Sequence, residues 1–193
     1  LQAWKPTAIS VENVSGLQCD FMRRYPSRYA DSTEDYCVDT SPAEAATGMD
    51  VLTANVEMER LLAAWPDQPT PSQRRRLAAV CLAAGERGSA LVQWMRLPAA
   101  ERRAADSLTP ELVQFLETRR VRKDEVGLVA AELAARLGLE RLWSVDDHTA
   151  DAATPKAQQK ASMAAIRKAW DNRAGEIRGA AYDRLYANVD TPD

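Results

Sequence analysis

Two short β-branched segments stand on either side of a long stretch with helical periodicity, and they limit the folds open to this chain. TAISVE at 7–12 and LERLWSVD at 139–146 are short and apolar, as buried strands are. Strands joined through helices run parallel when they share a sheet, and two strands alone make a marginal sheet. We therefore predict a helix-rich α/β fold with short parallel strands and a large helical insertion between them, at about 42–138. The chain is expected to be a single domain over 1–193 that is part of a larger α/β domain.

Apolar spacing and terminating residues predict the helices of the intervening stretch. The expected helices are Val51–Trp65, Ser72–Ala84, Ser89–Leu97, one that begins at Thr109-Pro110, and one with the inner stripe Val126, Val129, Leu133 and Leu137. Gly138 should end the last of these in a left-handed conformation. After the second strand, Thr154-Pro155 should begin a long charged helix that Gly175 and Gly179 weaken.

Charge and hydropathy restrict the partners. The net charge of −3 provides no basic surface for nucleic acid, and the one basic run, Arg74–Arg76, is predicted to be the solvated face of a helix. No apolar run approaches the roughly 18 residues that a membrane span requires. We expect a small-molecule or peptide substrate, no nucleic-acid partner and no transmembrane segment. Trp94 and Trp143 are predicted to be core residues.

The three cysteines have different surroundings. Cys81 lies on an apolar helical face and is predicted to be a small core residue. Cys19 and Cys37 flank a polar, tyrosine-rich segment; they could form a disulfide, which requires an oxidising compartment, or remain two thiols. A disulfide would bring their Cα atoms within about 7 Å. With one histidine and no CxxC motif, the chain has too few nitrogen and sulfur ligands for a classical structural zinc site.

Both predicted strands end in acidic residues. Glu12 ends the first, and Asp146, Asp147 and His148 end the second. Ligands of open α/β sheets bind beyond the carboxyl ends of the strands, where carboxylates can hold a hard cation or act as acid and base. His148 could serve as a ligand or a proton carrier. The alternative is that these residues only cap turns, as Asp124 and Glu125 are expected to do at the start of their helix.

Three segments resemble a known family. KPTAISVE at 5–12, GERGSALVQWMRLPAAER at 85–102 and KDEVGLVAAELAARLGLERLWSVDDHTAD at 123–151 resemble an uncharacterised bacterial domain-of-unknown-function family. That family is related to the TraB/PrgY, Tiki and erythromycin-esterase-like superfamily. The resemblance extends over about residues 1–151. It implies an α/β fold with a helical insertion, hydrolytic and metal-assisted chemistry, and a periplasmic or exported protein rather than a cytoplasmic one.

The resemblance also implies site residues. Glu12 matches the Glu that ends the family's second strand; Asp146, Asp147 and His148 match its Asp-Asp-His; and Glu125 matches the Glu of its Asn-Glu pair. Asp124 stands where the family has Asn. The family's opening and closing Gly-x-x-His strands and its Arg-Asn helix would lie outside this chain. If the chemistry depends on those histidines, this chain alone is expected to be inactive.

Two hypotheses follow. In the first, the chain carries a hydrolase-type active site with Glu12, Asp146, Asp147, His148 and Glu125 as catalytic residues, and Glu12, Asp146 and His148 as ligands of a divalent metal ion. In the second, it is a non-enzymatic helical binding or structural module in which these residues only cap turns. If Glu12 and Asp146 end neighbouring parallel strands, their Cα atoms should lie within about 10 Å.

Overall fold

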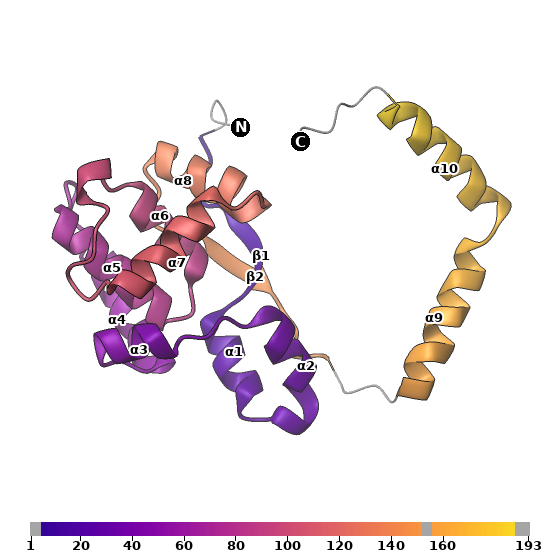
Figure 1. Ribbon diagram of the computed structural model, residues 1–193, viewed down its shortest axis with the longest axis horizontal. Coiled ribbons are helices and arrows are strands. Elements are labelled where there is room, and N and C mark those ends of the chain that lie inside the picture. The colour runs from indigo at the N-terminus through magenta and orange to yellow at the C-terminus, as the bar shows by residue number, and fades with distance from the viewer. Residues whose placement is uncertain (1–4, 152–155, 188–193) are drawn as a thin grey trace. The chain divides into compact units, whose positions relative to one another are not determined.

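The computed structural model describes residues 5–151 and 156–187, and the chain divides into two compact units, 1–152 and 153–193 (Figure 1). The first unit contains two strands and the helices up to α8; the second contains α9 and α10. The described chain is thus helix-rich with a small parallel sheet, and the prediction of a helix-rich α/β fold is confirmed at that level.

The two strands are adjacent and parallel, as predicted. β1 (Ser10–Val14) pairs with β2 (Trp143–Asp146), with Ser10 opposite Trp143 and Val14 opposite Asp146. β1 has one more residue than β2 between the paired positions, which bends the strand and turns both Asn13 and Val14 inward. Because the strands are parallel, both carboxyl ends lie at the same edge of the sheet.

The helices of the first unit occupy the chain between the strands. They are α1 (Gly16–Arg23), α2 (Pro26–Tyr36), α3 (Ser41–Thr47), α4 (Val51–Ala63), α5 (Pro71–Ala83), α6 (Arg87–Met95), the short 3₁₀ helix η2 (Ala99–Glu101), α7 (Pro110–Val121), the π-helical segment η3 (Val126–Ala131) and α8 (Glu132–Leu137). α7 begins where the sequence indicates: the Thr109 side chain accepts a hydrogen bond from the Leu112 N–H. α5 begins one residue before the predicted Ser72, after a capping box formed by Thr70 and Gln73.

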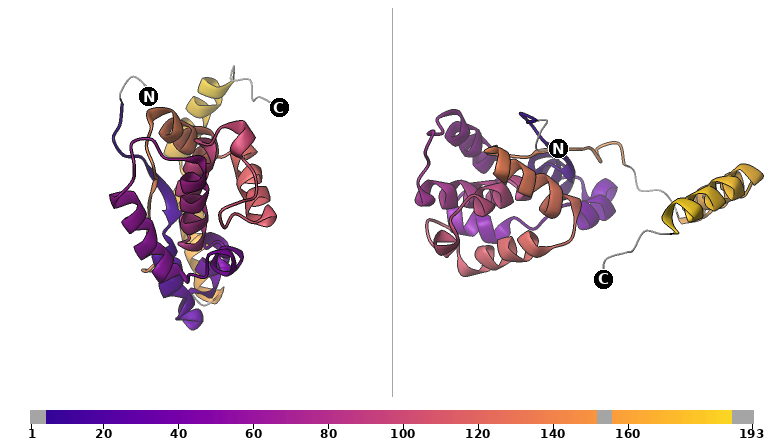
Figure 2. Two further views of the ribbon diagram at one scale, coloured as in Figure 1. Left: turned by 90° about the vertical axis from the view of Figure 1, so that its left-hand side faces the viewer. Right: turned by 90° about the horizontal axis from the view of Figure 1, so that it is seen from above.

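The sheet is covered by helices on one face. Val11 and Leu142 pack there against Leu91 and Val92 of α6 and the alanines of η3 and α8, and Figures 1 and 2 show these helices on one side of the strands. Strand side chains alternate, so Trp143 and Val145 point to the other face, where they are 45% and 59% exposed. The prediction that Trp143 is a core residue is therefore wrong. Its ring instead packs under the Arg141 guanidinium, 3.9 Å away.

Helix α5 lies at the centre of the larger core, where Trp94 and Cys81 are buried as predicted. Its run of small residues lets neighbouring helices approach from all sides, so Arg74 and Arg75 are 6% and 5% exposed. The predicted solvated face is wrong for these two residues. Arg74 forms an ion pair with Glu140 at 2.8 Å, and Arg75 pairs with Glu101 and Asp106, both at 2.7 Å.

The helix predicted before Gly138 presents a different face from the expected one. Its first part is π-helical, which places the inward-facing positions differently from those of a regular α-helix. The buried residues are Gly127, Ala130, Ala131 and Ala134. Of the predicted inner stripe, Val126 packs against the core, whereas Val129 is 49% exposed. Gly138 does end the helix in the left-handed conformation, with φ of 77°.

Cys19 and Cys37 form a disulfide, with Cα atoms 5.6 Å apart, which decides the alternative that the sequence left open. The bond joins α1 to the residue that follows α2. Cys81 is a free, buried thiol, and burial raises its pKa.

Glu86, at the start of α6, is buried and connects three elements. Its carboxylate accepts hydrogen bonds from the Gly16 N–H (3.3 Å) and the Ser144 hydroxyl (2.8 Å). Burial raises the pKa of Glu86, although these hydrogen bonds act in the opposite direction. α1, β2 and α6 therefore meet at a common point beside the carboxyl edge of the sheet.

The second unit consists of α9 (Lys156–Trp170) and α10 (Arg173–Tyr186). The helix that was expected to weaken at Gly175 breaks earlier, where the Asn172 side chain accepts the Gly175 N–H and begins α10. The predicted start at Thr154-Pro155 lies outside the described residues. No helix in the described parts of the chain is both long and apolar enough to cross a membrane.

Candidate functional site

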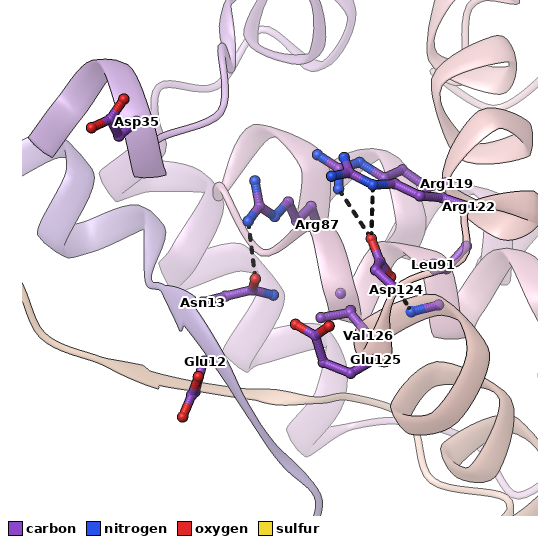
Figure 3. Close-up of a pocket in the computed structure, with 12 residues that line it drawn as sticks. Glu12, Asn13, Asp35, Arg87, Leu91, Arg119, Arg122, Asp124, Glu125 and Val126 are labelled. Carbon is purple, nitrogen blue, oxygen red and sulfur yellow. Dashed lines mark hydrogen bonds and ion pairs between the residues drawn. The ribbon is translucent and has the colours of Figure 1, made fainter. Parts of the chain in front are cut away.

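A polar pocket of about 340 Å³ opens beside the carboxyl end of β1 (Figure 3). β1, α2, α6, α7 and the segment between α7 and η3 contribute its walls. This is the position at which open α/β sheets bind ligands. We call this cavity the rim pocket.

Three arginines form one wall of the rim pocket: Arg87 of α6, Arg119 of α7 and Arg122 just after α7. Asp124 lies 3.1 Å from Arg122 Nε and 3.9 Å from Arg119 Nη1, and it also accepts the Gly127 N–H at 2.7 Å. Burial lowers the pKa of Arg87 and of Arg119, and repulsion among the guanidinium groups lowers both further, against the attraction of Asp124. The wall therefore brings together more positive charge than its one ion-paired carboxylate neutralises.

Asn13 extends this wall from the end of β1. Its side chain is almost fully buried, and its Oδ1 accepts a hydrogen bond from Arg87 Nη2 at 3.0 Å. That bond fixes the orientation of the amide, because a guanidinium can only donate. The amide nitrogen Nδ2 has no hydrogen-bond partner among the described residues, and Figure 3 shows it directed toward the pocket. A buried donor without an acceptor is costly, so this position favours an acceptor from a ligand.

Two of the predicted site residues line the rim pocket. Glu125 points into it, toward Asn13, whereas Glu12 points away from the arginines because strand residues alternate (Figure 3). Asp35 of α2 lies on the opposite side of the pocket. Asp124 caps the first turn of η3, as expected, but the Glu125 carboxylate makes no capping hydrogen bond.

The Asp-Asp-His segment forms a separate cluster at the end of β2. His148 contacts Asp151 through Nδ1 at 2.9 Å and Asp146 through Nε2 at 3.0 Å, and its ring stacks on Tyr36 at 3.8 Å. Asp147 accepts both the N–H and the hydroxyl of Thr149. From α2, the Ser32 hydroxyl donates to the Asp151 carboxylate, and the Tyr29 hydroxyl donates to the Thr149 carbonyl. The segment thus fastens α2 to the end of β2.

This cluster does not fit the metal site that the sequence predicts. Both ring nitrogens of His148 already lie within hydrogen-bond distance of a carboxylate oxygen, Nδ1 of Asp151 and Nε2 of Asp146, and these contacts raise the pKa of the imidazole. Asp146 is paired with Val14 rather than with Glu12, whose carboxylate points away from the arginine wall. Within residues 5–151 and 156–187, no group of three or more His, Cys, Asp or Glu side chains is arranged to hold a metal ion.

His148 is expected to stabilise the fold in a pH-dependent way. Burial lowers its pKa, but the hydrogen bonds and charges of Asp151 and Asp146 outweigh burial and raise it above 6.5. The stabilisation is therefore full below pH 6.5 and is lost as the pH rises through the folded-state pKa. We expect His148→Gln to lower the free energy of unfolding by about 1 kcal/mol near pH 5.5 and by less near pH 8.5. Urea denaturation at both pH values measures this, and equal losses would contradict it.

The sequence did not indicate the residues that form the arginine wall. Arg87, Arg119 and Arg122 lie among other charged residues of helices, and Asn13 follows a predicted strand end without any motif. Only the crossing of β1, α6 and α7 brings them together.

Comparison of this chain with protein-family models, with curated proteins and with solved structures finds no match. The resemblance to the TraB/PrgY, Tiki and erythromycin-esterase-like superfamily accordingly remains an expectation from short motifs. What the structure itself defines is a helix-rich α/β protein with an arginine-lined pocket at the carboxyl edge of its parallel strands.

Proposed function

We propose that the rim pocket is a hydrolase-type active site, in a larger α/β domain whose helical segment is inserted between the strands. The observation that carries this proposal is the position of the Glu125 carboxylate, which faces Asn13 from within a pocket whose wall holds three arginines (Figure 3). The substrate is a small molecule or peptide with an anionic group.

Each side chain then has a defined role. Glu125 is the general base: its carboxylate has no capping hydrogen bond and is exposed to water, so it can take a proton from a water molecule that attacks the substrate. As the ester, phosphoester or amide bond breaks, Glu125 returns this proton to the leaving group. The arginines and Asn13 bind the substrate and stabilise negative charge that develops during the attack. His148 is a positioning residue, because its ring stacks on Tyr36 of α2, the helix that carries Asp35 to the opposite side of the pocket. Asp146 holds the His148 ring, and Asp147 holds the turn that follows through Thr149.

The second candidate is a binding module without catalysis. It is favoured because Asp124 accepts the Gly127 N–H and Asp147 accepts the Thr149 N–H, as expected of acids that only cap turns. In this case the rim pocket holds its ligand without reaction.

The Cys19–Cys37 disulfide supports a periplasmic or exported location in either case. Disulfides persist in oxidising compartments and are rare in the reducing cytosol.

Glu125→Gln separates the two candidates. We expect this variant to lower kcat by roughly 100-fold or more on any ester, phosphoester or amide that the protein hydrolyses, because the amide cannot take the proton. The control is Glu111→Gln, which removes an exposed carboxylate from the start of α7 and should leave kcat unchanged. Turnover that survives in Glu125→Gln would refute the role of Glu125. Ligand binding with no turnover of any substrate by the wild-type protein would establish the binding module.

A further inference from the structure

We infer that the rim pocket binds the phosphate group of a phosphorylated small molecule. This inference deepens the proposed function, because it names the ligand class of the same site. It depends on the arginine wall and Asn13, and not on the catalytic role of Glu125.

The buried amide nitrogen of Asn13 has no hydrogen-bond partner among the described residues. Asn13 is 5% exposed, its Oδ1 is held by Arg87, and its Nδ2 is left without an acceptor. A buried N–H donor has no water as a hydrogen-bond partner. A ligand acceptor that bonds to it therefore contributes more to binding than one that bonds to an exposed, hydrated donor. The nitrogen points toward the space beside the arginine wall (Figure 3).

The positive charge of the arginine wall is only partly paired. Arg122 and Arg119 share Asp124, whereas Arg87 has only the neutral Asn13 amide as its hydrogen-bond partner among the described residues. The other acids of the pocket form no ion pair with this wall: Glu12 points away, and Asp35 and Glu125 pair with no described residue. An anion beside Arg87 and Asn13 would supply a charged partner for the guanidinium and an acceptor for the amide nitrogen. Hydroxyl groups of the same ligand could donate to Glu125 or Asp35.

The number of donors favours phosphate over carboxylate. Three guanidinium groups and one amide surround the site, more donors than the two oxygens of a carboxylate can accept in good geometry. A phosphate ester presents three oxygens that match the planar fork of arginine. The pocket volume of about 340 Å³ also exceeds that of phosphate alone and lies in the range of small-molecule sites. We therefore expect a phosphorylated molecule to bind more tightly than free phosphate.

Isothermal titration of the full chain with inorganic phosphate, glucose 6-phosphate and glucose tests this inference. We expect saturable binding of both phosphates, tighter for the ester, and none for glucose. Asn13→Asp should weaken phosphate binding by about tenfold or more, because it replaces the free donor with a carboxylate in the same shape. The new carboxylate can pair with Arg87, so this variant is expected to remain folded.

Arg122→Gln is the second variant, and it decides the matter if Asn13→Asp fails to fold. Arg122 is 59% exposed in its side chain, so its loss should weaken phosphate binding several-fold without affecting the fold. Arg76→Gln is the matched control, since Arg76 is a similarly exposed arginine on α5 that pairs with Glu57 away from the pocket. Affinity for phosphate that is unchanged in both pocket variants, or absent from the wild-type protein, would overturn the inference.

Glu125→Gln distinguishes this inference from the proposed function. If both are correct, this variant binds glucose 6-phosphate at least as tightly as the wild-type protein but has lost turnover. If the protein binds phosphate esters and hydrolyses nothing, the hydrolase proposal fails and the assignment of the ligand stands.

Discussion

Gly16→Ala is expected to unfold the first unit or to lower its free energy of unfolding by more than about 4 kcal/mol. A Cβ at Gly16 would lie 1.7 Å from the Ala84 carbonyl oxygen and 2.9 Å from the Gly85 Cα. Both are backbone atoms at the end of the central helix α5, so no side-chain rotation can relieve the overlap. Circular dichroism and urea denaturation measure the loss.

Two other glycines are controls for this prediction. Gly48 has a left-handed φ of 70°, but a Cβ there would meet no atom within 4 Å, so Gly48→Ala should cost only about 1 kcal/mol of backbone strain. Gly179 lies in α10 with open space around it, and Gly179→Ala should be neutral or stabilise that helix by up to about 1 kcal/mol. A Gly16→Ala protein as stable as the wild type would show that α1 does not approach α5 this closely.

The approach of Gly16 to Gly85 also bears on the rim pocket. Gly85 is followed by Glu86 and then by Arg87. Glu86 accepts the Gly16 N–H, and Arg87 donates to Asn13. The close backbone contact therefore sets where α6 begins relative to β1. A protein that tolerated a side chain at Gly16 by moving α1 would be expected to lose the Arg87–Asn13 hydrogen bond and phosphate affinity together.

Replacing both Cys19 and Cys37 by serine is expected to lower the free energy of unfolding by about 2–4 kcal/mol, because the disulfide closes a loop with a sequence separation of 18. The loop contains α2, whose Tyr36 stacks on His148, so the same change should weaken the attachment of α2 to β2. Denaturation with and without a reductant measures the effect.

Reductant sensitivity provides the internal control for the disulfide. Wild-type protein and a Cys81→Ala variant should both lose stability when reduced, since Cys81 is a free thiol, whereas the double serine variant should not respond. Equal stability of the oxidised and reduced wild-type protein would contradict the prediction.

Local features of the fold could be predicted from the sequence because their physical causes are local. Thr109 begins a helix and Gly138 ends one through hydrogen bonds and backbone conformations within a few residues. The parallel pairing of the strands also followed, since helical connections permit no tight hairpin between them. The burial of Cys81 and Trp94 followed from apolar periodicity.

Other features were decided only by tertiary contacts. Arg74 and Arg75 are buried because Glu140, Glu101 and Asp106 arrive from distant segments, and a basic run by itself does not reveal such partners. Trp143 is exposed within the first unit because the helices of that unit cover only the opposite face of the sheet, although its apolar character favours burial. The π-helical segment moved Val129 outward, and the side-chain period used for prediction assumes a regular α-helix.

Some residues of the candidate site could be predicted from the sequence, whereas their grouping could not. The sequence alone indicated Glu12 and the Asp146–His148 segment as candidates, because both follow predicted strands, whereas Glu125 became a candidate only through the family resemblance. Their grouping depended on the fold: strand alternation turned Glu12 away, and Asp151 and Tyr36 enclosed His148. Asn13, Arg87, Arg119 and Arg122 converge only because β1, α6 and α7 meet at one edge of the sheet. Spacing along the chain carries no information about that meeting, since it is set by long-range packing.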